Sequence, residues 1–315
     1  MPLNARQQKE LSRHCPKVMW HADMAAYSTF RTGGKVEALV EIAHTEQLPA
    51  LLIWSHREKI PWKVLGGGSN VLFSSGLHEG LFIRLRQSAA TIKCDEPLPG
   101  SMGQVFLVQA GAGVHMAALV SWCMQRGLSG LEFMSGIPGT IGGAVYMNAG
   151  AFQHSISEKI VRLDCLLSTG KRVSLSAHDI CFRYRKSIFP QELGKAVLVE
   201  CVYLNLQQDT TDEVAGRCRD FVAQRMAKHP GGVASAGSFF KNPAGDFAGR
   251  LIEQAGLKEC VCGGAMVSPH HCNFIVNHSG ASPEDILFLM RTIQEKVYSQ
   301  SGILLEPEVR IFGEV

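Results

Sequence analysis

Three consecutive glycines followed by two short polar side chains form the first segment of the chain that could perform chemistry. Gly66–Gly68 precede Ser69 and Asn70, and this turn directly follows the apolar run Trp62–Leu65. Glycine adopts positive φ and allows close backbone approach, so such a turn can direct consecutive backbone N–H groups at one anion. The loop therefore suits a diphosphate that is bound without a lysine.

A second segment, Ser135–Ala151, is also poor in side-chain bulk. It contains five glycines and one proline, Pro138. Either a ligand fills the space that larger side chains would occupy, or two tight turns pack within a glycine-tolerant core. The spacing alone leaves both interpretations open.

Two common nucleotide-binding motifs are absent. The Gly-Lys pairs at Lys35, Lys171 and Lys195 lack a following Ser or Thr, so there is no P-loop. Gly111–Gly113 lies between an expected strand and an expected helix, as a dinucleotide-binding turn does. Met116 stands where that turn requires its third glycine, so we reject this match.

A group of cysteines and histidines near the end of the chain raises the question of a metal site. Cys260, Cys262 and Cys272 are close in sequence, with His270 and His271 beside the last of them. Three thiolates and one imidazole could bind zinc, but structural zinc sites usually contain Cys-x-x-Cys turns, which this segment lacks. We interpret these cysteines as small buried thiols and predict no metal.

The elements that must position the first glycine loop form a β-α-β unit. Residues 1–20 predict a helical lead-in. The pattern then predicts a strand at Ala38–Ile42, a helix at Glu46–Glu58 and a strand at Trp62–Leu65 that ends at the loop.

The second glycine segment lies inside another α+β unit. Val105–Ala110 predicts a strand, and Met116–Arg126 predicts a helix with one apolar face. Ile160–Leu167 and Lys195–Leu204 predict further strands.

The last third of the chain predicts three helices. The first covers Thr211–Lys228 and ends before Pro230 and the glycines that follow it. The second covers Phe247–Ala255. The third begins at a capping box formed by Ser282 and Asp285.

The closing segment Leu304–Phe312 predicts a strand in which alternate residues share a face. Glu306, Glu308 and Arg310 then lie on one face and apolar residues on the other. The polar residues between Leu206 and Thr211 mark the expected start of the last domain.

The composition narrows the class of protein. The chain has 315 residues, 46% of them hydrophobic, and a formal net charge of +3. Its basic residues are scattered, which disfavours a nucleic-acid partner. No apolar run is long enough to span a membrane or to form a signal peptide, and the ten cysteines show no disulfide pattern. We expect a cytoplasmic protein with reduced thiols and, since no exposed apolar stripe is evident, a monomer.

Six motifs occur in order and together resemble the UDP-N-acetylenolpyruvoylglucosamine reductase family. The resemblance covers about Tyr27–Gly313, and the number of separate motifs makes it specific. The motifs are Thr29–Gly34, Leu65–Leu72, Gly136–Asn148, Phe182–Phe189, Gly237–Pro243 and Leu305–Arg310.

The resemblance implies an α+β fold of the vanillyl-alcohol-oxidase (PCMH) type with FAD bound by two subdomains. After a lead-in at 1–26, the FAD-binding domain covers 27–207, with subdomains at about 27–87 and 88–207. A C-terminal α+β substrate domain covers 208–315. Related covalent flavin enzymes often carry a histidine in the first loop, where this chain has Ser69, so we expect noncovalent FAD.

The resemblance also implies which residues contact the cofactor. In the first loop they are Gly66, Gly67, Gly68, Ser69 and Asn70. In the second they are Gly139, Thr140, Gly142, Gly143, Ala144 and Asn148.

The implied reaction is the NADPH-dependent reduction of an enolpyruvyl UDP-sugar, with three catalytic residues. Arg185 matches the arginine that grips the substrate carboxylate, a task suited to a guanidinium. Ser238 matches the proton donor and Glu308 a glutamate beside the flavin. Less specific matches to the family motifs place Tyr184, Arg225, Lys228, Asn242 and His271 in the substrate site.

This chain resembles the shorter branch of the family, because no room remains between Arg185 and Thr211 for a tyrosine-bearing insertion. The alternative is another flavin oxidase or dehydrogenase of the same superfamily that acts on a sugar or an alcohol. Its fold would be the same in outline, so only Arg185, Ser238 and Glu308 separate the two.

Overall fold

The computed structural model describes residues 2–86, 92–94, 104–194, 196–228 and 232–313. The chain forms two compact units, and the first comprises Met1–Met19, Ala38–Gly67 and Gly80–Gln224. The second comprises Trp20–Glu37, Gly68–Glu79 and Arg225–Val315. The limits of the units differ from the domain limits expected from the sequence, and the expected subdomain joint at 87–88 lies outside the described residues.

The first unit contains the expected β-α-β arrangement. A four-stranded sheet has the order β1 (Val18–Asp23), β2 (Lys35–Ile42), β5 (Leu77–Leu85) and β3 (Trp62–Val64). Strands β3 and β5 are parallel, with Trp62 opposite Leu81. Helix α1 (Ala5–His14) packs against α2 (Leu48–Arg57), and the two strands and the helix that the sequence predicts are confirmed. The predicted helical lead-in at 1–20 is confirmed only over Ala5–His14, because strand β1 begins at Val18.

A larger sheet lies beside the second glycine segment. Its strand order is β12 (Arg172–Ser176), β11 (Ile160–Leu167), β15 (Val197–Gln208), β7 (Val105–Gly111) and β6 (Ile92–Cys94), with β8 (Leu128–Ser129) also paired to β15. The neighbouring strands are antiparallel.

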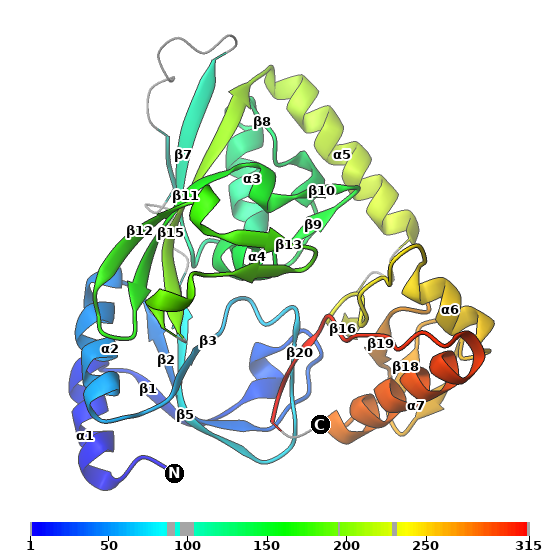
Figure 1. Cartoon of the computed structure of the whole chain (residues 1–315), viewed down its shortest axis with the longest axis horizontal. Helices are drawn as coiled ribbons and strands as arrows, with labels where there is room; N and C mark the ends of the chain where they lie inside the picture. Colours follow the sequence, from blue (N-terminus) through cyan, green and yellow to red (C-terminus); the bar gives the residue numbers. More distant parts are fainter. Residues whose placement is uncertain (1, 87–91, 95–103, 195, 229–231, 314–315) are drawn as a thin grey trace. The chain divides into compact units, whose positions relative to one another are not determined.

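Two helices lie beside this sheet. They are α3 (Met116–Met124) and α4 (Ile141–Tyr146), and α4 packs against β7 and β15 (Figure 1). The predicted strands and helix of this region are confirmed, except that the expected strand start at Lys195 lies outside the described residues.

Two hairpins complete the first unit. One consists of β9 (Gly150–Ala151) and β10 (His154–Ser155), the other of β13 (Cys181–Arg183) and β14 (Lys186–Ile188). The long helix α5 (Thr211–Lys228) has the bounds that the sequence predicts, and its expected end at Pro230 lies outside the described residues.

The second unit is built around helix α7 (Pro283–Ser301). Ser282 and Asp285 form the predicted capping box at its start. Its inner face packs against the sheet β16 (Ala234–Ser235), β19 (Ile275–Asn277), β18 (Ala265–Val267) and β17 (Val261–Cys262). Helix α6 (Ala248–Gln254) also packs on α7.

Two short segments from early in the chain take part in the core of the second unit. Strand β4 (Val71–Phe73) pairs in parallel with β20 (Arg310–Phe312), and Phe30 and Leu72 are buried among residues of the C-terminal third. The predicted closing strand is therefore confirmed only over its last three residues. Its alternation does hold, because Leu305 and Val309 are buried whereas Glu306 and Arg310 are exposed.

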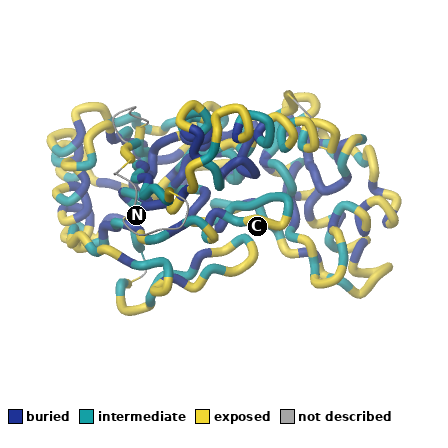
Figure 2. The backbone as a smooth tube through the Cα atoms, turned by 90° about the horizontal axis from the view of Figure 1, so that it is seen from above, coloured by how far each residue is buried: buried dark blue, intermediate teal, exposed yellow. Residues whose placement is uncertain are grey.

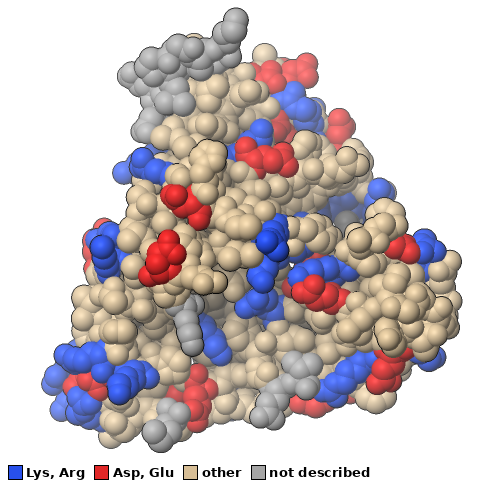
Figure 3. All heavy atoms as spheres, viewed as in Figure 1, with Lys and Arg blue, Asp and Glu red and all other residues tan. Residues whose placement is uncertain are grey.

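The surface agrees with the scattered charge of the sequence. In Figure 2 the buried positions gather inside each part of the molecule and the exposed positions gather in its outer turns. On the face that Figure 3 shows, acidic and basic side chains of the described residues are interspersed. Within the described part of the chain no helix is both long and apolar enough to cross a membrane.

Candidate active site

In the first unit the two glycine loops touch through their backbones. A Cβ atom added to Gly67 would lie 2.7 Å from the Cα of Gly139, and one added to Gly66 would lie 2.7 Å from Oγ1 of Thr140. Both distances are shorter than van der Waals contact, so side chains larger than hydrogen are excluded at these positions. The structure thus brings together two segments that lie more than 70 residues apart and that the family resemblance assigns to one ligand.

The second loop is held by hydrogen bonds to the turn at Gly111–Gly113 and to the residues directly after it. Ile141 donates its N–H to the carbonyl of Val114 and Gly142 donates to that of Ala112, each at 2.9 Å. Met116 donates in return to the carbonyl of Gly139, also at 2.9 Å. The turn is no dinucleotide motif, but its carbonyls fix the position of the loop. Its glycines were a signal for close packing that we did not use.

Helix α4 joins this loop to the hairpin that carries Arg185. Thr140 caps α4 by accepting the N–H of Gly143 at 3.4 Å. At the other end, Asn148 donates from Nδ2 to the carbonyl of Arg183 at 3.1 Å, and Ser187 donates to the carbonyl of Val145 at 2.5 Å. The predicted cofactor residue Asn148 is buried and holds the hairpin that carries Arg185.

Arg185 occupies a strained turn. Tyr184 and Arg185 connect β13 to β14, and Arg185 has a φ of 56°. This left-handed conformation is uncommon for residues other than glycine and costs roughly 1–2 kcal/mol. The Arg185 guanidinium lies 5.1 Å from the centre of the Tyr184 ring, within the range of a cation–π contact. A strained backbone that persists at a proposed catalytic residue is typical of functional sites.

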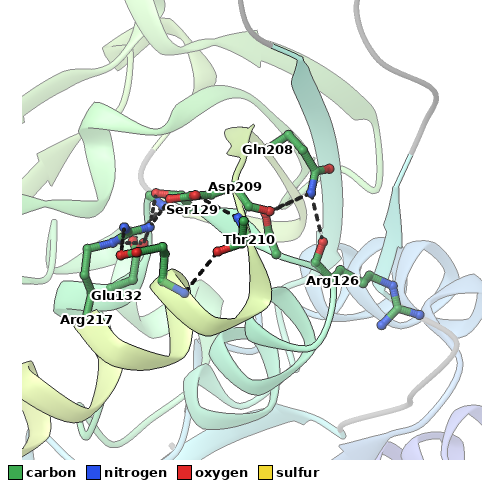
Figure 4. Close-up of polar contacts among 10 residues, drawn as sticks. Arg126, Ser129, Glu132, Gln208, Asp209, Thr210 and Arg217 are labelled. Carbon is green, nitrogen blue, oxygen red and sulfur yellow. Dashed lines mark hydrogen bonds and ion pairs between the residues drawn. The ribbon is translucent and has the colours of Figure 1, made fainter.

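A partly buried ion-pair network fixes the start of the second loop (Figure 4). Arg217 on α5 pairs with Glu132 at 2.9 Å and with Asp209 at 2.6 Å, and it donates to Oγ of Ser129 at 3.2 Å. Glu132 also accepts the N–H of Gly130 at 2.7 Å. Burial by itself would raise the pKa of Glu132, but these hydrogen bonds hold its pKa below the ordinary range. The sequence analysis gave Glu132 no such role.

The rest of the first glycine loop belongs to the second unit. A Cβ atom on Gly68 would lie 1.8 Å from the carbonyl oxygen of Tyr27, so only glycine fits. Thr29 donates its N–H to the carbonyl of Gly68 at 3.0 Å. The Thr29–Gly34 motif, which sequence analysis left without a task, thereby supports this loop.

Asn70 connects the loop to the closing segment. Its Nδ2 donates to the backbone carbonyl of Glu308 at 3.1 Å, and its own carbonyl accepts the N–H of Arg310 at 3.0 Å. A residue predicted to contact the cofactor therefore holds the backbone of a residue predicted to be catalytic. Both residues are half-buried.

Ser238 and Glu308 lie on neighbouring antiparallel segments. Glu308 donates its N–H to the carbonyl of Phe239 at 2.8 Å, and Phe240 pairs with Pro307. The buried Asn273 fixes the same segment by accepting the N–H of Phe240 at 2.9 Å and donating to its carbonyl at 2.8 Å. Ser238 itself is half-buried, between the positive-φ Gly237 and the fully buried Phe239.

The predicted substrate residues of the second unit have different environments. His271 is half-buried, and burial lowers its pKa, which favours the neutral ring. Its Nδ1 accepts the N–H of Asn273 at 3.1 Å, so the neutral ring carries its proton on Nε2. Asn242 uses Oδ1 to accept the N–H of Ala248 at the start of α6. Lys228 is exposed and Arg225 half-buried, both on the last turn of α5.

The cysteine group lies in and beside a hairpin of the second unit. Cys262 is in β17, Cys260 directly precedes that strand, and burial raises the pKa of the Cys272 thiol. Among the described residues no three His, Cys, Asp or Glu side chains are grouped so that they could hold a metal.

The donor set of the two loops fits FAD. Neither loop carries a lysine or an arginine, so backbone N–H groups are the donors that it offers to an anionic diphosphate.

Comparisons with known proteins agree with this site. Residues 36–176 match the family model of an FAD binding domain, and residues 228–312 match the C-terminal domain of UDP-N-acetylenolpyruvoylglucosamine reductase. The UDP-N-acetylenolpyruvoylglucosamine reductase of Clostridioides difficile (strain 630) is 37% identical over 92% of this chain and 92% of its own length. That of Rubrobacter xylanophilus is 37% identical over 96% of this chain and 98% of its own.

A solved structure extends the similarity to the fold. The crystal structure of UDP-N-acetylenolpyruvylglucosamine reductase from Thermus caldophilus has a TM-score of 0.77 and 31% sequence identity, covering 94% of this chain and 98% of its own.

The FAD-binding region and its glycine loops define the class of the protein as an FAD-dependent oxidoreductase with an α+β fold, as the sequence predicts. The chain belongs to the UDP-N-acetylenolpyruvoylglucosamine reductase family. The roles of individual residues stay predictions.

Proposed function

We propose that this chain uses noncovalent FAD and NADPH to reduce UDP-N-acetylglucosamine enolpyruvate to UDP-N-acetylmuramate, a step in making peptidoglycan precursors. The activity named for its relatives supports this proposal. The structural observation that carries it is the hydrogen bond from the Glu308 N–H to the Phe239 carbonyl, because it keeps Ser238 and Glu308 on adjacent segments.

The residues that would hold FAD come from both glycine loops. We assign the diphosphate to the backbone of Gly66–Asn70 and the flavin side to Gly139–Ala144, with Asn148 as support from the end of α4. When bound, FAD would supply hydride transfer from NADPH to the terminal alkene carbon of the substrate. The product gains this hydride and one proton, and NADP+ is released.

Arg185 binds the substrate carboxylate in this proposal. As hydride arrives at the terminal carbon, negative charge develops on the adjacent carbon and spreads into the carboxylate. A guanidinium that donates two parallel hydrogen bonds stabilises that charge better than a point cation does. The turn at Arg185 and its anchor to Asn148 limit the directions in which this side chain can extend.

Ser238 donates the proton that the adjacent carbon requires. A serine hydroxyl is a weak acid in water, so the site must stabilise its alkoxide or resupply its proton at once. The carboxyl group of Glu308 belongs to the neighbouring segment and is the nearest candidate in sequence register for that task. We therefore assign Glu308 to the support of proton transfer.

In this proposal the UDP-sugar is bound by polar and basic side chains that the resemblance assigns to the substrate site. His271 offers Nε2–H as a neutral donor, and Asn242 retains its Nδ2 donors because only its Oδ1 is used by α6. Lys228 and Arg225 supply positive charge for the diphosphate, and Tyr184 supplies a ring beside Arg185.

The test is an anaerobic assay of the two half-reactions. Purified protein with its flavin is mixed with NADPH, and the loss of the oxidised flavin absorbance is followed. UDP-N-acetylglucosamine enolpyruvate is then added, and we expect rapid recovery of that absorbance without oxygen. Recovery that needs oxygen and ignores the sugar would instead identify the oxidase alternative.

A further inference from the structure

The outer face of α7 carries two large exposed aromatic side chains. Phe288 is 58% exposed and Tyr298 56% exposed, although the opposite face of the same helix is buried in the core. Leu304, just beyond the helix, is 68% exposed. Large apolar side chains that gather on one surface are typical of interaction sites.

Two charges of opposite sign lie between the aromatic residues. Arg291 and Glu295 are exposed, and at 100° per residue all four side chains fall within about 80° of the helix circumference. Within the described chain neither charge forms a hydrogen bond or an ion pair. We call Phe288, Arg291, Glu295 and Tyr298 the α7 outer face.

The order of these residues is self-complementary. The steps from Phe288 to Arg291, to Glu295 and to Tyr298 are three, four and three residues, which read the same in either direction. A second helix laid antiparallel therefore brings each aromatic side chain opposite the other aromatic and each arginine opposite a glutamate. Such pairing by one surface with itself is what a two-fold dimer requires.

A hollow lies at one end of the α7 outer face and provides a recess for a side chain of the second copy. It has a volume of about 260 Å³ and is lined by Arg291, Gln294, Glu295, Tyr298 and Leu304. In the antiparallel arrangement Phe288 of the second copy lies at the level of Tyr298, where this hollow opens. The exposed Phe288 ring of one copy thus meets the hollow of the other, and the two-fold axis repeats this contact at the other end of the face.

We propose that the α7 outer face pairs with the same face of a second copy of this chain, forming an antiparallel two-fold dimer. The contact is small, so its dissociation constant is on the order of micromolar. Our expectation of a monomer, drawn from the absence of an apolar stripe in the sequence, did not include this face. None of its residues belongs to the proposed catalytic or binding set.

Sedimentation velocity of the full-length flavoprotein over about 1–500 µM tests the proposal. We expect a concentration-dependent dimer. Arg291→Glu and Glu295→Arg should each weaken it on the order of tenfold or more, because each places like charges opposite one another. The combined variant should restore the dimer to within about threefold, because the pairs are re-formed with exchanged signs. Phe288→Ala should also weaken it.

Lys296→Glu is the matched control, since Lys296 is exposed on the same helix but outside the α7 outer face. It should leave the dimer unchanged, and all variants should retain the flavin spectrum and NADPH turnover. A chain that stays monomeric throughout the concentration range overturns the proposal and leaves the face to a different partner. A dimer insensitive to these changes, or single-variant losses that the combined variant does not repair, also overturns it.

Discussion

The Asn70 side chain donates a hydrogen bond to the backbone carbonyl of Glu308 at 3.1 Å, although the two residues are 238 positions apart. Asn70 also accepts the N–H of Arg310 through its own carbonyl. One residue of the first glycine loop thus holds the backbone directly after a proposed catalytic glutamate. These hydrogen bonds join Asn70 to the closing segment at Glu308 and Arg310 within the second unit.

Replacing Asn70 by Ala should impair the flavin chemistry beyond its effect on stability. Loss of the bond to Glu308 should lower the free energy of unfolding by about 1 kcal/mol. It should also slow re-oxidation by the sugar, because the Glu308 backbone is released. Asn277→Ala is the matched control. It breaks the side-chain bonds of Asn277 to Phe30 and Ala281 in the same unit, so it should lower stability at least as much without changing either half-reaction.

Ser238→Ala should separate the two half-reactions. Flavin reduction by NADPH should continue, whereas re-oxidation by the enolpyruvyl sugar should slow by about 10²–10⁴-fold, the usual contribution of a proton donor. Stopped-flow absorbance measures both rates. Ser235→Ala, in the nearby strand β16, is the control and should alter neither. An equal loss of both rates in Ser238→Ala contradicts the assigned role.

Two substitutions of Arg185 should separate the effect of its strained backbone from the effect of its guanidinium. Arg185→Gly should keep or raise the melting temperature by relieving the positive φ, and it should abolish turnover by removing the guanidinium. Arg185→Lys should keep the charge but raise KM for the sugar about tenfold or more, because the forked contact is lost. If Arg185→Gly retains normal turnover, Arg185 has no catalytic task.

Glu132→Gln should change how stability depends on pH. The folded-state pKa of Glu132 lies below its ordinary value of 4.5, so its stabilisation is present above that value and is lost as pH falls through the lower folded-state pKa. At about pH 7 the variant should unfold at lower urea concentration than the wild type, by about 1–3 kcal/mol. At acidic pH the difference should shrink. A difference that is constant with pH would show that the charge of Glu132 is irrelevant.

Denaturation should release the flavin. Because Ser69 stands where covalent relatives carry a histidine, acid precipitation should leave the yellow colour in the supernatant. The absorbance of the supernatant gives the molar ratio of FAD to protein, and a covalently flavinylated protein serves as the control for retention. Colour that stays in the pellet would contradict noncovalent binding.

Much of the fold was predictable because local patterns determine it. The capping box at Ser282, the bounds of α5 and the strand at Ile160–Leu167 all follow from residues near in sequence. Alternation in the closing segment correctly separated Leu305 and Val309 from Glu306 and Arg310.

The supports of the candidate site were not predictable in this way. The carbonyls of Ala112 and Val114 act through the backbone, and nothing in their side chains indicates this task. The ion pairs of Glu132 depend on Arg217, 85 positions away, which only tertiary structure brings near. Likewise, periodicity located the buried face of α7 but could not show that Phe288 and Tyr298 remain uncovered.

The second unit takes residues from both ends of the chain, and this has a consequence for synthesis. Phe30 and strand β4 leave the ribosome long before β20, their partner near the last residue. Since domains fold as units during translation, this one can complete its core only after β20 has been synthesised. Expressing the segment from Arg225 onward by itself would therefore yield a core that lacks two of its buried side chains and one strand of a parallel pair.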